Sequence, residues 1–85
     1  MSSVITAPEL LIENVNVVFS SGMYQLSAKS GYTLVSAYIV NRPSEERNIY
    51  AVISMQCNTD GTYNLRNQND SLSSGARLRL VWAKN

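Results

Sequence analysis

Two dense runs of β-branched and aromatic residues, 33–41 and 48–57, most constrain the fold of this 85-residue chain. Such side chains favour strands, because they pack well on a pleated, half-buried surface. The charged segment 42–47 separates the two runs, and Asn58-Thr59-Asp60-Gly61 follows the second. Asp-Gly supplies the positive φ that a tight hairpin needs. The two runs therefore predict two long strands, with a hairpin turn after the second.

Four other segments alternate between apolar and polar side chains, which is typical of strands that bury one face. In the last of them, Leu78, Leu80 and Trp82 share one face, so we expect Trp82 to anchor the core. Regularly spaced strands with turn signals between them indicate an all-β sandwich or barrel. We therefore expect a small antiparallel β-sandwich of about six strands: residues 11–19, 23–28, 33–41, 48–57, 62–66 and 76–83.

The domain organisation follows from the same pattern. Residues 1–9 are small, polar and interrupted by Pro8, which disfavours regular structure before it. We expect them to form a flexible lead-in. Residues 10–85 then form a single β-sandwich domain, as the length of the chain suggests.

Both dense runs are apolar on two faces, whereas a strand in a two-layer sandwich buries one face and exposes the other. In so short a chain, the simplest way to bury the second apolar face is contact with another copy of the same subunit. We therefore expect a homotrimer. The alternative is a monomer with partly exposed aromatic residues. The residues predicted for the subunit interface are Leu34, Tyr38, Val40, Tyr50 and Val52.

The composition offers little for catalysis. The chain has no histidine, which is the commonest general base and the commonest neutral metal ligand. Cys57 is the only cysteine, so it lacks both a disulfide partner and a histidine that could activate it. The chain contains no Gly-x-Ser-x-Gly motif and no glycine-rich phosphate loop. We therefore expect no enzyme, no cofactor and no metal.

Charge and hydropathy limit the possible partners. The formal net charge is +1, so no basic excess favours a nucleic-acid surface. No apolar run reaches the roughly 20 residues that span a bilayer, so we expect no membrane insertion.

One polar segment stands out as a candidate binding site. It combines an aromatic ring, a guanidinium group and several amides, which suit flat contacts and paired hydrogen bonds to a glycan or a polar peptide. The alternative is a solvent-exposed loop whose tyrosine packs in the sheet. The candidate residues are Tyr63, Asn64, Arg66, Asn67, Gln68, Asn69 and Asp70.

Two segments carry a resemblance to a known family. Residues 30–38, Ser-Gly-Tyr-Thr-Leu-Val-Ser-Ala-Tyr, and the closing residues 74–82, Ser-Gly-Ala-Arg-Leu-Arg-Leu-Val-Trp, resemble elements of the C-terminal tip domains of phage and prophage tail-fibre proteins. The resemblance implies a trimeric β-sandwich that binds host surface glycans or proteins without enzymatic activity. It also implies a location in the virion tail, extracellular on release. The alternatives are a structural virion module, for capsid decoration or fibre trimerisation, and a monomeric lectin-like module.

Overall fold

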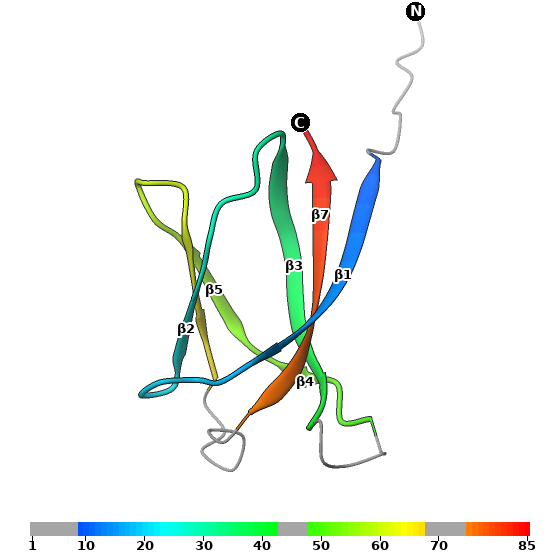
Figure 1. The fold of residues 1–85 in the computed structure, drawn as a ribbon, viewed down its shortest axis with the longest axis vertical. Coiled ribbons are helices and arrows are strands. Elements are labelled where there is room, and N and C mark those ends of the chain that lie inside the picture. Colours follow the sequence, from blue (N-terminus) through cyan, green and yellow to red (C-terminus); the bar gives the residue numbers. More distant parts are fainter. Residues whose placement is uncertain (1–8, 43–47, 68–74) are drawn as a thin grey trace, which may run out of the picture.

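The computed structural model describes residues 9–42, 48–67 and 75–85, which contain antiparallel strands and no helix. The strands form a four-stranded sheet in the order β1-β7-β3-β4 and a three-stranded sheet in the order β2-β6-β5 (Figure 1). The expected all-β, antiparallel fold is confirmed. The strand bounds are β1 Leu10–Val17, β2 Met23–Leu26, β3 Tyr32–Asn41, β4 Ala51–Val52, β5 Ser54–Cys57, β6 Tyr63–Arg66 and β7 Ala76–Lys84.

Of the expected lead-in, residues 1–8 lie outside the described part of the chain. Glu9 is tied to the larger sheet, because its carbonyl oxygen accepts a hydrogen bond from the backbone N–H of Lys84 at 2.9 Å.

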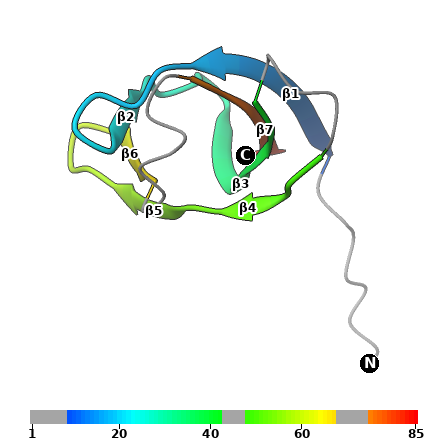
Figure 2. The same cartoon turned by 90° about the horizontal axis from the view of Figure 1, so that it is seen from below.

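The run 48–57, expected as one strand, forms two strands in different sheets. β4 pairs with β3, and β5 pairs with β6. Ile53, the residue between them, is buried in the core. The chain therefore changes sheet at a corner around Ile53, and β4 and β5 together connect the two sheets on this side of the molecule (Figure 2).

Strand β7 lies between β1 and β3 and shows the predicted alternation most clearly. Ala76, Leu78, Leu80 and Trp82 are buried, and the residues between them are partly exposed. Trp82 is 1% exposed, so its predicted place in the core is confirmed.

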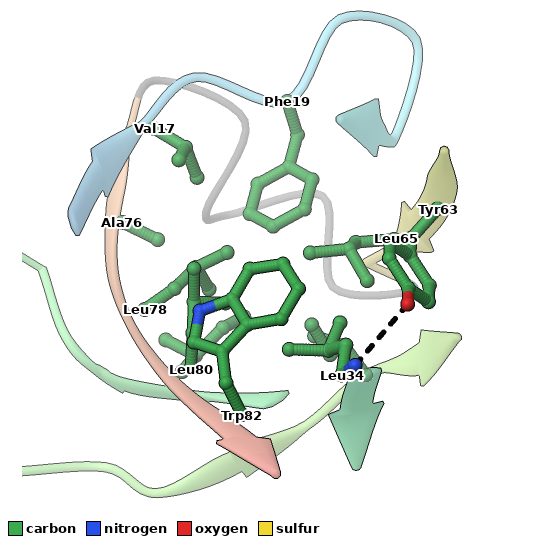
Figure 3. Packing of buried hydrophobic residues seen from close by; sticks show 11 residues of the cluster. Val17, Phe19, Leu34, Tyr63, Leu65, Ala76, Leu78, Leu80 and Trp82 are labelled. Carbon is green, nitrogen blue, oxygen red and sulfur yellow. Dashed lines mark hydrogen bonds between the residues drawn. The ribbon is translucent and has the colours of Figure 1, made fainter. Parts of the chain in front are cut away.

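The two sheets share one core. Leu65 and Tyr63 of β6 face Leu34 of β3 and Trp82 of β7 (Figure 3). The rings of Tyr63 and Trp82 meet edge to face, with centroids 5.9 Å apart. The hydroxyl of Tyr63 accepts the backbone N–H of Leu34 at 3.1 Å, which joins the sheets by a hydrogen bond as well as by apolar packing.

The hairpin predicted at Asn58–Gly61 is confirmed and connects β5 to β6. The backbone N–H of Gly61 donates to the carbonyl of Asn58 at 3.0 Å, and Gly61 adopts a φ of +88°. Asp60 Oδ1 accepts hydrogen bonds from Thr62 Oγ1 at 2.6 Å and from Thr62 N at 3.0 Å. These bonds, the hydroxyl first, lower the pKa of Asp60 below its ordinary value of 3.8.

We expect a Thr62→Val variant to raise the pKa of Asp60 towards 3.8, because the strongest donor to the carboxylate is removed. A lowered pKa in the folded state means that this carboxylate stabilises the hairpin above pH 3.8, and that this contribution is lost as the pH falls through the lowered value. An NMR pH titration of the Asp60 carboxyl group measures the shift. Thr59→Val, next to Asp60, is the matched control and should leave the pKa unchanged.

Candidate functional site

Strand β6 and the residue after it hold the described part of the predicted host-contact segment, and burial corrects the assignment of two residues. Tyr63 is 6% exposed. The backbone N–H of Leu34 donates to its hydroxyl, and the ring of Trp82 packs against its ring. Tyr63 therefore belongs to the core and offers no face to a ligand. Asn67 is 8% exposed, and its backbone N–H donates to the carbonyl of Gly22 at 2.8 Å. Both residues are therefore buried, and the hydroxyl of Tyr63 serves an internal hydrogen bond.

The other members of that segment divide into three groups. Arg66 is exposed on β6. Asn64 is half-buried, and its Oδ1 accepts a hydrogen bond from Asn58 Nδ2 at 3.0 Å, which ties the hairpin to the strand. Gln68, Asn69 and Asp70 lie outside the described residues. Of the described members, Arg66 is thus the one whose side chain faces solvent freely.

Two of the predicted interface residues are also corrected. The register of β3 against β7 shifts between Leu34 and Ser36 and again between Ile39 and Asn41, so strict alternation fails along β3. An extra residue in one strand reverses which side chains face the core beyond it. Leu34 and Val40 are consequently buried within the subunit, at 3% and 5% exposure, and neither lies on an outer face.

The outer face of the larger sheet nevertheless carries exposed apolar side chains. Val52, one of the predicted interface residues, is 88% exposed on β4 and lies opposite Tyr38 of β3. The rings of Tyr38 and Tyr50 are 6.4 Å apart. On β1, Leu10 and Ile12 are about half exposed and share the same face. We call this set the outer patch: Leu10, Ile12, Tyr38, Tyr50 and Val52.

Arginine side chains tie the strands of this face together. Arg79 of β7 donates from Nε to Asn14 Oδ1 at 3.1 Å and from Nη1 to the Tyr38 hydroxyl at 3.0 Å. Its guanidinium also lies 5.7 Å from the centre of the Tyr38 ring. These contacts hold the Tyr38 ring against the neighbouring strand β7.

A groove that the sequence reasoning did not identify lies between β1 and the segment 26–30. Its volume is about 420 Å³. The Lys29 ammonium and the Glu13 carboxylate form an ion pair with Nζ and Oε1 3.0 Å apart, and Lys29 Nζ lies 5.4 Å from the centre of the Trp82 ring. The apolar wall consists of Val15, Leu26, Ala28, Leu80 and Trp82, and the polar groups come from Glu13, Ser27, Lys29 and Ser30.

One signal in the sequence points to this groove. Glu13 has the same parity in β1 as Val15 and Val17, and it lies opposite Leu80, which is buried. An acid at an inward-facing position of a strand needs a partner, because burying an unpaired charge is costly. Lys29, beyond the end of β2, is that partner, and no local pattern in the sequence connects the two.

The described residues offer no grouping of three acidic, thiol or imidazole side chains that could hold a metal ion. Within the same residues, no helix is long and apolar enough to cross a membrane. Cys57 is exposed at the end of β5.

Comparisons of the chain with models of protein families, with curated proteins and with solved structures found no match.

Proposed function

We propose that this chain is a non-enzymatic tip domain of a phage receptor-binding protein, a β-sandwich that assembles as a homotrimer and binds a host-surface glycan or protein. The observation that carries the proposal is the outer patch on the larger sheet. Two further features support it. The chain forms two antiparallel sheets around one core, and residues 30–38 and 74–82 resemble tail-fibre tips.

The outer patch supports assembly because its apolar side chains are exposed in the single subunit. Val52, Ile12 and Tyr50 are 88%, 58% and 56% exposed. Exposed apolar side chains that gather on one face of a small soluble domain commonly mark a protein–protein interface. In the proposed trimer these side chains contact neighbouring subunits, and each subunit presents its polar loops to the host.

A structural virion module without a host ligand is the second candidate. The burial of Tyr63 and Asn67 favours it, because it removes two residues from the predicted host-contact segment and leaves the outer patch intact. Both candidates place the chain in a virion, the first in the tail and outside the cell after release. They differ in whether the oligomer has a ligand on the host.

Light scattering on the purified chain tests the assembly. We expect about three times the subunit mass of 9.4 kDa at micromolar concentration. A monomeric mass across that range would contradict the trimer. Attachment of the labelled oligomer to host cells or to a glycan array then separates the two candidates, since a trimer that binds neither is the structural module.

A further inference from the structure

We propose that the groove between β1 and residues 26–30 binds a neutral sugar ring, and that Lys29 covers Trp82 until the sugar enters. The inference rests on the proposed function and names the ligand class and the place of binding. It locates the ligand between the two sheets, away from the segment 63–70.

The groove lies where the two sheets part. β1 is the outermost strand of the larger sheet and β2 that of the smaller sheet, and no described strand pairs with either on the facing side. On the opposite side, Ile53 connects β4 directly to β5 and closes the space between the sheets (Figure 2). The β1–β2 side is therefore where the groove lies, with the buried side chains of Leu80 and Trp82 beneath it.

The lining of the groove is that of a small-molecule site. Apolar side chains from both sheets form the wall, and a few polar groups converge on it, the arrangement that ligand pockets commonly show. The volume of about 420 Å³ lies within the range of roughly 300–1,000 Å³ that is typical of such sites.

The charges of the groove favour a neutral ligand with many hydroxyl groups. Glu13 accepts hydrogen bonds and would repel an anion, whereas Lys29 donates them and would repel a cation. Neighbouring hydroxyls of one sugar ring can donate to the carboxylate and accept from the ammonium together. The C–H face of the same ring suits an aromatic wall, which here is Trp82.

Lys29 is held weakly enough to move. Both members of the Glu13–Lys29 pair are about one-third exposed, and ion pairs at that level of exposure contribute little to stability. Lys29 Nζ lies over the ring of Trp82, so displacement of this side chain would open the indole face to the groove.

The fluorescence of Trp82 tests the inference directly, because it is the only tryptophan in the chain. The intact chain is titrated with D-glucose, D-galactose and N-acetyl-D-glucosamine, and in parallel with glucosamine and glucuronate as charged counterparts. We expect a saturable change in emission with at least one neutral sugar, and a weaker response to its charged counterparts. The absence of a saturable response to all three neutral sugars would overturn the inference.

Two variants connect the response to the groove. Glu13→Gln and Lys29→Met retain the length of the side chains and remove the charges. Each should weaken sugar binding about tenfold or more, since hydrogen bonds to charged groups contribute roughly 1.5–3 kcal/mol. Lys84→Met is the matched control: Lys84 pairs with Glu9 at 3.5 Å outside the groove, so its loss should leave the affinity unchanged. If all three variants bind the sugar with the affinity of the wild type, the groove is not the site.

Host attachment distinguishes failure of this inference from failure of the proposed function. Undiminished attachment by folded Glu13→Gln and Lys29→Met variants would overturn the groove as the receptor site and leave the proposed function standing. A wild-type trimer that does not attach to host cells counts against the proposed function, and the fluorescence titration still decides whether the groove binds sugar.

Discussion

A Trp82→Ala variant is expected to lose about 3–5 kcal/mol of unfolding free energy, which is the usual cost of replacing a core aromatic side chain by alanine. Trp82 is 1% exposed and contacts the ring of Tyr63 from the other sheet, so its removal leaves a cavity between the sheets. For a domain of this size, such a loss lowers the melting temperature by at least about 12 °C. Because small domains have little stability to spare, we expect the variant to be largely unfolded or strongly destabilised at room temperature.

Far-UV circular dichroism is the appropriate measurement, since the variant contains no tryptophan for fluorescence. Val18→Ala is the control: Val18 is apolar and 63% exposed, and truncation of an exposed side chain should change stability by no more than about 0.5 kcal/mol. A melting temperature of Trp82→Ala equal to that of the wild type would show that the sheets do not pack on Trp82.

The strands could be predicted where the side-chain pattern is local and regular. β7 shows why: alternation of apolar and polar residues from Ala76 to Leu80 specifies the inward face directly, and Trp82 continues it. The β5–β6 hairpin was equally predictable, because Asp60-Gly61 provides both the side-chain acceptor and the positive φ that the turn uses. These features depend on neighbours within a few residues.

Other features depend on partners far along the chain and could not be predicted. The extra residues in β3 that bury Leu34 and Val40 show up only in the pairing with β7. The burial of Tyr63 depends on Leu34, 29 residues earlier. The corner at Ile53 likewise exists because β4 and β5 pair with different sheets, which the continuous apolar run conceals.

The candidate sites also divide into those that a local pattern predicts and those that depend on partners far along the chain. The two-sided apolar run predicted a subunit interface at Val52 and Tyr50, and both side chains are exposed in the single subunit. Composition, by contrast, misplaced Tyr63 and Asn67, because a tyrosine or an asparagine is equally able to make contacts inside the protein. The groove was missed because its ion pair joins Glu13 of β1 to Lys29 in the connection between β2 and β3, which no local pattern links.

The second large effect is expected at the outer patch, where a Val52→Lys variant should change the proposed trimer to a monomer. Val52 is 88% exposed, so a lysine there costs the isolated subunit little. In an assembled interface the same lysine would be desolvated. It would also lie on the same face as the positively charged Arg79, because Val52 and Arg79 are paired with Tyr38 from its two sides. Burial of an unpaired charge at an interface is strongly unfavourable.

Light scattering should therefore give a mass near 9.4 kDa for Val52→Lys, with a melting curve that remains cooperative. Val18→Lys is the matched control, because Val18 is also exposed but lies outside the paired strands of either sheet, and it should retain the mass of the wild type. If Val52→Lys and the wild type form the same oligomer, Val52 is not in the interface. A wild-type monomer would contradict the assembly itself and leave the exposed apolar side chains of β1 and β4 as a surface for a different partner.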